Sequence, residues 1–217
     1  MKRENWDKFA GIYDVFMKKD HKAYEKMYKL IGERVKGRIV LELATGTGLI
    51  AKHIVRYAKH IEATDYSSKM IEEARKGNCS SKLHFSVQDA CKLPYVDGAY
   101  DVVIISNALH IMSTPEKALQ EIKRVLKPDG LLIAPTFTHG KMNFLKKLLS
   151  KMMGLVGFST ENRWTAEEYC EFLEKQGWRI QKIAVLKASF PLTYVECKAK
   201  NVSKMNIEKM RCVDEEE

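Results

Sequence analysis

The run "VLELATGTGLIAKHI", residues 40–54, constrains the fold of this chain more than any other stretch. It starts as an apolar segment of strand type, passes through small residues, and continues as a helix-like segment. Gly46 and Gly48 carry no Cβ, so the backbone can bend sharply and approach a ligand closely. The N–H groups at the start of the next helix can then bind a polar or negative group. The run predicts a strand–turn–helix unit that holds a nucleotide, but the turn alone does not identify which one.

Short apolar runs alternate with helix-like segments along the first two thirds of the chain. Strands are expected at 38–43, 61–64, 83–87, 102–106 and 131–136, and helices at 48–58, 67–76 and 115–126. This alternation predicts an α/β protein with a Rossmann-like, doubly wound and mostly parallel sheet covered by helices on both faces. Ligands bind such sheets at the carboxyl ends of the strands, where the strand order reverses.

The pattern changes after residue 164. The run "TAEEYCEFLEKQGW" opens with a capping box formed by Thr165 and Glu168, and Gly177 ends the predicted helix. Two β-rich runs follow, at 178–187 and 193–199, and they should pair as a C-terminal antiparallel hairpin. With the hairpin, the expected sheet has seven strands.

The length of 217 residues fits one domain. We expect this domain to span 1–200, with an N-terminal helical cap (1–37), a cofactor-binding core (38–140), a lid insertion (141–163) and a C-terminal helix and hairpin (164–200), followed by a charged tail (201–217). The five cysteines form no CxxC pair, so neither a metal site nor a disulfide framework is indicated. No membrane-spanning run or secretory signal is recognised, and we therefore expect a cytoplasmic protein.

The formal net charge of +9 could serve an acidic partner such as nucleic acid or anionic lipid. The lysines are spread along most of the chain, however, and no Arg-rich tract with interleaved aromatic residues occurs. This distribution favours a generally basic surface and argues against nucleic-acid binding.

Three carboxylates follow or end neighbouring strands of the predicted sheet. Glu42 lies in an otherwise apolar strand and needs a partner, such as a ligand ammonium group or backbone N–H groups. Asp65 ends the second strand at a distance from the glycine turn that suits hydrogen bonds to a ribose diol. Asp89 follows the third strand, where it could accept from an adenine amine. Each could instead cap a helix or face water, but their common edge favours a nucleotide site.

The order of motifs resembles the class I S-adenosylmethionine-dependent methyltransferases, and within them the branch that includes the ubiquinone/menaquinone-biosynthesis methyltransferases. The matching runs are "WDKFAGIYD", "VLELATGTG", "EATDYSSKMIEEAR", "FSVQDACKLPYVDGAYDVVIISNALHIM" and "KALQEIKRVLKPDGLLIAPT". They cover about residues 6–199 together with the C-terminal helix and hairpin. The resemblance implies S-adenosylmethionine as cofactor, S-adenosylhomocysteine as product, and a small, apolar or aromatic methyl acceptor.

The resemblance also implies a set of cofactor-binding residues. Those near the methionine portion and the turn are Tyr13, Glu42, Ala44, Gly46, Gly48, Ser106 and Asn107. Those near the ribose and adenine are Asp65, Tyr66, Met70, Asp89 and Ala90. The family usually has glycine where this chain has Ala44, and one methyl group there narrows the approach to the cofactor slightly.

A sulfonium methyl group is already electrophilic, so in-line transfer mainly needs a nucleophile held close in a water-poor site. A base is needed only if the acceptor arrives protonated. His110, just past the fourth strand, is the catalytic candidate, and His139 is the second; either could instead pack within its loop.

The acceptor is expected to depend on residues 141–158, an amphipathic, Met-rich and basic stretch. It is interpreted as a lid over the site, with peripheral contact to anionic lipid or simple core packing as alternatives. A monomer or a homodimer is expected. Alternative functions are a methyltransferase acting on nucleic acid or protein, and a nicotinamide-dependent oxidoreductase on a similar sheet.

Overall fold

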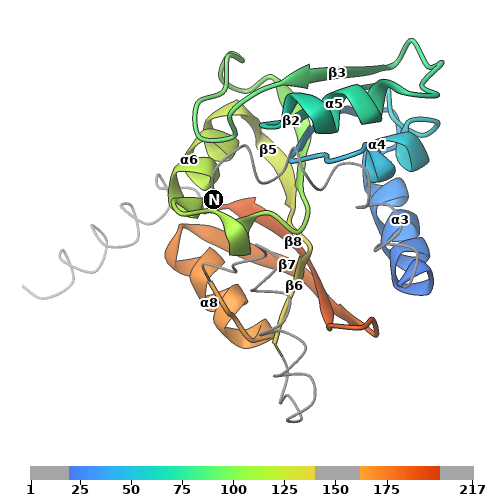
Figure 1. Cartoon of the computed structure of the whole chain (residues 1–217). Helices are drawn as coiled ribbons and strands as arrows, with labels where there is room; N and C mark the ends of the chain where they lie inside the picture. The colour runs from blue at the N-terminus through green and yellow to red at the C-terminus, as the bar shows by residue number, and fades with distance from the viewer. Residues whose placement is uncertain (1–19, 140–161, 201–217) are drawn as a thin grey trace, which may run out of the picture.

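The strand–turn–helix unit expected at residues 40–54 is present in the computed structural model, which describes residues 20–139 and 162–200 (Figure 1). Strand β1 runs from Ile39–Leu43 and helix α4 from Leu49–Ile54. Tyr13, the stretch 141–158 and the tail 201–217 lie outside the described residues. Among the helices of the described part, none has both the length and the apolar character needed to cross a membrane.

The central sheet confirms the predicted Rossmann-like architecture. After β1 come β2 (His60–Asp65), β3 (Leu83–Val87), β4 (Tyr100–Ile105), β5 (Leu126–Ile133), β6 (Thr136–Phe137), β7 (Trp178–Leu186) and β8 (Leu192–Ala199). The order is β3-β2-β1-β4-β5-β8, in which the first five strands are parallel to their neighbours. The strand order reverses at β1, which lies between β2 and β4.

Strand β8 extends the sheet beyond β5. It pairs antiparallel with β5 and β6 along one edge and with β7 along the other, so the predicted hairpin is confirmed. The described residues form eight strands instead of seven, because β6 continues the line of β5 after an interruption at Pro135. The two strands stay aligned across this interruption, because the Ala134 N–H donates to the Val195 carbonyl of β8 at 2.9 Å.

Helices cover both faces of the sheet (Figure 1). Helices α3 (His21–Val35), α4 and α5 (Ser68–Arg75) lie on one face, and the buried residues Ile31, Ile54 and Ile71 share one apolar cluster. The 3₁₀ helix η1 (Leu109–Ile111), α6 (Pro115–Val125) and α8 (Ala166–Lys175) contribute to the second cluster, with Leu119 and Leu173 among its members.

Strand β1 shows why the parallel strands appear in the sequence as continuous apolar runs. Val40 belongs to the cluster beneath α3 and α4, whereas its neighbour Leu41 belongs to the cluster beneath α6 and α8, and both are fully buried. A strand buried on both faces has no position left for a solvent-exposed residue.

Two helix boundaries expected from the sequence are present in the structure. The capping box of Thr165 and Glu168 is present at the start of α8, as predicted. The helix expected at 115–126 ends at Val125, directly before the "KPDG" run, and this run lies inside β5. Tyr100 pairs with Leu126 and Val102 pairs with Leu131, so the intervening residues of β5 bulge out of the sheet.

Gly48 provides a test of the packing beneath the turn. A Cβ at this position would lie 2.8 Å from the Phe85 ring, and the residue has φ of +80°. We expect Gly48→Ala to lower the free energy of unfolding by about 2–4 kcal/mol, through left-handed strain and overpacking together. Urea denaturation measures this loss. Gly37→Ala is the matched control, because it has φ of +68° but open space around it, and equal losses in the two variants would rule out the packing contribution.

Candidate functional site

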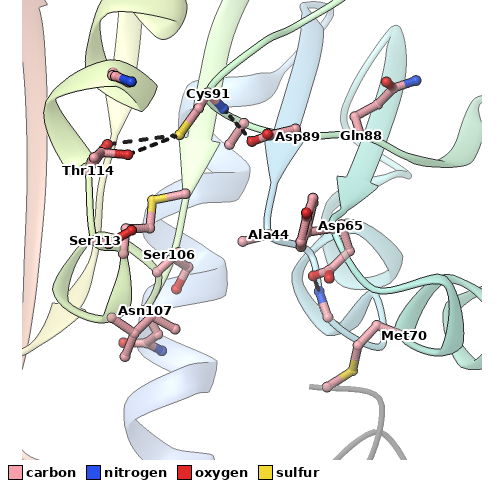
Figure 2. A pocket seen from close by; sticks show the side chains of 17 residues that line it. Ala44, Asp65, Met70, Gln88, Asp89, Cys91, Ser106, Asn107, Ser113 and Thr114 are labelled. Atoms are coloured by element: carbon pink, nitrogen blue, oxygen red, sulfur yellow. Dashed lines mark hydrogen bonds between the residues drawn. The ribbon is translucent and has the colours of Figure 1, made fainter. Parts of the chain in front are cut away.

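A cavity of about 400 Å³ lies at the carboxyl ends of β1, β2 and β4, where the strand order reverses. Figure 2 shows Asp65 and Met70 on one side of it and Ser106, Asn107 and Thr114 on the opposite side. This is the edge at which doubly wound sheets bind their ligands.

The turn after β1 forms one wall of the cavity through Ala44 and Gly46. Both residues have left-handed backbone, with φ of 51° at Ala44 and 58° at Gly46. The turn is fixed by Asp65, whose carboxylate accepts from the N–H of Gly46 and from the N–H of Ser67, each at 2.9 Å. Asp65 itself lines the cavity.

Glu42 lies behind this wall, and its side chain is almost completely buried. Burial raises the pKa of Glu42 to about 8, and the nearby Asp65 carboxylate adds to the shift. Its Oε2 has no hydrogen-bond partner among the described residues. A buried carboxyl oxygen without a partner is costly, which fits a position that a cationic or hydrogen-donating ligand would satisfy.

The end of β4 forms the opposite wall with Ser106 and Asn107. The Ser106 hydroxyl is buried and has no partner among the described residues, so it too fits a polar ligand atom. Asn107 differs, because its amide is used within the protein: Nδ2 donates to the Tyr24 hydroxyl at 2.8 Å, and Oδ1 accepts from the Phe137 N–H at 3.1 Å. Asn107 also has φ of 52°, a left-handed conformation that asparagine tolerates better than most residues.

The third wall comes from the segment after β3 and from the start of α6. Asp89 accepts from the Cys91 N–H at 2.8 Å, and the Cys91 sulfur lies 3.8 Å from the Thr114 hydroxyl. Burial raises the pKa of the Cys91 thiol, so this thiol is not an activated nucleophile. Lys117 is the one cation among the described lining residues.

His110 lies on η1, next to the lining residue Ile111, but is not itself in the cavity wall. Its Nδ1 is 2.8 Å from the Thr136 hydroxyl, so Nε2 is the ring nitrogen that the described part of the chain leaves for a substrate. Burial lowers the pKa of His110 to about 4, and the nearby His139 adds to the effect. Burial also lowers the pKa of His139, with Arg163 contributing. Both rings are therefore neutral near pH 7.

The structure brings most of the predicted residues to this one cavity. Nine line it: Ala44, Gly46, Asp65, Tyr66, Met70, Asp89, Ala90, Ser106 and Asn107. Glu42, Gly48 and His110 do not line it, and Gly48 instead faces the ring of Phe85 and the methyl group of Ala74. Their roles, like that of Tyr13, stay predictions.

Sequence reasoning missed eight further lining residues: Gln88, Cys91, Ala108, Ile111, Met112, Ser113, Thr114 and Lys117. Most of them follow β3 or β4 within the loops that already contained predicted site residues. Their position after a strand could have suggested Gln88 and Ala108, but nothing in the sequence indicates that the start of α6 bends back to the same cavity.

The strand order, the cavity at the reversal point and the acidic residues on its rim define the Rossmann-like class of nucleotide-binding folds. Within that class, residues 41–134 match the family model described as "Methyltransferase domain". This match and the relatives described next confirm the resemblance to S-adenosylmethionine-dependent methyltransferases that the motifs predicted.

Known proteins extend this likeness. A demethylmenaquinone methyltransferase of Thermotoga maritima is 36% identical over 135 residues, which cover 59% of this chain and 58% of that relative. Among solved structures, a chain from a Haloferax volcanii complex between the Trm112 methyltransferase activator and a methyltransferase has a TM-score of 0.76 at 20% identity, with 92% of this chain and 97% of that chain covered. The DhpI–SAH complex has a TM-score of 0.69 at 20% identity, with 91% and 95% covered.

Ala44 is a source of strain in the turn that can be removed. Its left-handed backbone conformation destabilises the folded protein by about 1–2 kcal/mol, because alanine carries a Cβ. Glycine would remove this strain, but its greater conformational freedom in the unfolded chain would cancel part of the gain. We expect Ala44→Gly to raise the free energy of unfolding by about 0.5–1 kcal/mol in urea titrations. Ala51→Gly, within helix α4, should lower it by about 1 kcal/mol. A destabilised Ala44→Gly variant would show that the methyl group packs favourably.

His110 predicts a dependence of stability on pH. Its pKa is lowered from 6.5 to about 4 in the folded protein, so between these values the unfolded chain binds a proton that the folded protein does not. The free energy of unfolding should therefore fall as pH falls from about 6.5 to 4, by up to about 3 kcal/mol from this group. Urea titrations at several pH values should show a shallower slope in His110→Asn. The exposed His53 on α4 is the control, and loss of the slope in His53→Asn instead would contradict the assignment.

Proposed function

We propose that this protein transfers a methyl group from S-adenosylmethionine to a small, apolar aromatic acceptor of the quinol class. The observation that carries the proposal is the cavity at the reversal of strand order, within a methyltransferase domain, with acidic residues at its rim. The acceptor class is suggested by the name of the Thermotoga maritima relative, of which this chain covers less than two thirds.

The described residues fit the polar groups of this cofactor. Asp65, at the rim of the cavity, would accept from the ribose hydroxyls, and Asp89 would accept from the adenine amine with the oxygen not bound to Cys91. The unpartnered Ser106 hydroxyl would meet the methionine portion. An ammonium group close to the buried Glu42 would favour the ionised form of that carboxyl group.

The apolar part of the cavity would hold the remainder of the cofactor. Met70 is buried, whereas Tyr66 is about half exposed and could cover the adenosine from the solvent side. Ala44 and Gly46 allow the backbone of the turn to come close, and Ala90 presents a small surface beside Asp89.

Bound S-adenosylmethionine supplies an electrophilic methyl group, and its in-line displacement yields S-adenosylhomocysteine. The chain contributes orientation and exclusion of water, which are the main requirements of such a transfer. We assign to the neutral His110 a hydrogen bond to the acceptor through Nε2, with Thr136 fixing its ring. A histidine with a pKa of about 4 is a weak base, so the acceptor must arrive ionised or be acidic itself.

The proposal is tested by calorimetry followed by turnover. We expect S-adenosylmethionine and S-adenosylhomocysteine to bind with micromolar dissociation constants, and quinols to be methylated in preference to amines and thiols in a screen for S-adenosylhomocysteine release. Asp65→Ala should weaken cofactor binding about tenfold or more, as expected for lost bonds to a charged group. Asp101→Ala is the control, because Asp101 also accepts a backbone N–H, from Ile39, but at the amino ends of the strands, away from the cavity. Binding of NADH without binding of either sulfur compound would favour an oxidoreductase.

A further inference from the structure

The guanidinium group of Arg124, near the end of α6, is unusual in having every donor occupied. Arginine has five N–H donors in a fixed planar fork. All five are used here, at distances of 2.6–3.0 Å from their acceptors: the Leu93 and Tyr95 carbonyl oxygens, one Asp97 carboxylate oxygen and both Glu121 carboxylate oxygens. The guanidinium group therefore binds the segment 93–97, through two backbone carbonyls and the Asp97 side chain, and also the Glu121 side chain of its own helix.

Glu121 completes this arrangement from the same helix. Its Oε2 accepts from the Leu93 N–H at 2.7 Å, so α6 binds both the N–H and the C=O of Leu93. Arg124 holds the pKa of Glu121 below its ordinary value, mainly through their hydrogen bonds, which keeps the carboxylate ionised. The Arg124 carbonyl also accepts from the Gly98 N–H at 2.9 Å.

The segment held in this way is the one that forms the third wall of the cavity. Asp89, Ala90 and Cys91 line the cavity directly before Leu93. Asp89 binds the Cys91 N–H through its side chain and the Lys92 N–H through its carbonyl. The turn that contains Asp89 is therefore continuous with Leu93 and Tyr95, whose carbonyls Arg124 binds.

Helix α6 therefore acts at both of its ends. Near its C-terminal end, Arg124 and Glu121 hold residues 93–98, and at its N-terminal end Thr114 and Lys117 themselves line the cavity. The Cys91 sulfur, 3.8 Å from the Thr114 hydroxyl, joins the two parts of the wall. The distance between the lining turn and the helix is thus set by contacts that lie outside the cavity.

We propose that Arg124 is a positioning residue that fixes the Asp89–Cys91 turn against α6 in the geometry required for the adenosine part of the cofactor. This inference rests on the proposed function for the identity of the ligand. The positioning of the turn depends on the planar geometry of the guanidinium group and not on its positive charge, because two different nitrogens of this one rigid group bind the Leu93 and Tyr95 carbonyls. A lysine ammonium cannot span them in the same way.

The first experiment measures amide hydrogen exchange in the protein without ligand. Arg124→Lys should make the amides of residues 88–98 exchange about tenfold faster while leaving the central strands protected. Lys127→Met is the matched control, because it removes an ion pair to Asp101 at the amino ends of the strands, away from the cavity. Unchanged exchange of residues 88–98 in Arg124→Lys would overturn the proposal, whatever the protein binds. Glu121→Gln, which retains a carbonyl for Leu93, should give a smaller change in the same direction.

The second experiment measures binding of S-adenosylhomocysteine by calorimetry, at a temperature well below the unfolding transition of each variant. Arg124→Lys should raise the dissociation constant about tenfold, since a loosened wall must be ordered on binding, and Lys127→Met should change it less than about twofold. In turnover, KM for S-adenosylmethionine should rise while kcat at saturation is retained. Faster loop exchange with unchanged affinity would overturn the positioning role. Failure of the unmodified protein to bind would overturn the proposed function instead, and the exchange result would still decide whether the clamp exists.

Discussion

The hydrogen bonds of the Asp65 carboxylate are the interaction on which the site depends. The turn after β1 contains left-handed residues at positions 44, 46 and 48, a conformation that chain sterics disfavour for all but glycine. Asp65 ends the neighbouring strand β2 and receives the N–H of Gly46, while its second oxygen receives the N–H of Ser67 at the start of α5. One carboxylate thus joins two strand ends and a helix start. The cavity lies between these three pieces and the segment that follows β4, where the strand order reverses.

The opposite side of the cavity is fixed by an amide instead of a carboxylate. Asn107 joins the end of β4 to Pro135, directly before β6, to Phe137 within β6, and to Tyr24 of α3. The two sides therefore have different chemical characters: a charged carboxylate organises the Asp65 side, whereas a neutral amide bonded to Tyr24 and Phe137 organises the Asn107 side. On the wall formed by Ser106 and Asn107, the Ser106 hydroxyl is therefore the buried side-chain group that the described residues leave without a partner and that a ligand would bind.

The periodicity of apolar residues was sufficient to predict the strand–helix alternation, and the carboxyl-end rule was sufficient to gather Asp65, Asp89 and Ser106 at one edge. Local signals such as the Thr165–Glu168 capping box were also confirmed. What the sequence did not reveal depends on contacts between distant residues. The bulge within β5 follows from its pairing with β4, and the links from Arg124 to Leu93 and Tyr95 span about thirty residues without any local pattern.

The pairing of β5 with β8 has a consequence for the smallest part of this chain that can fold alone. The segment matching the methyltransferase family ends at residue 134, yet Leu132 and Ile133 are paired to Cys197 and Glu196. Without β8, strand β5 would become an exposed edge of the sheet. The apolar surfaces now covered by Tyr169 and Trp178 would face water. The matched segment is therefore a unit of sequence similarity but not an autonomous folding unit, because its stability depends on the hairpin that follows it.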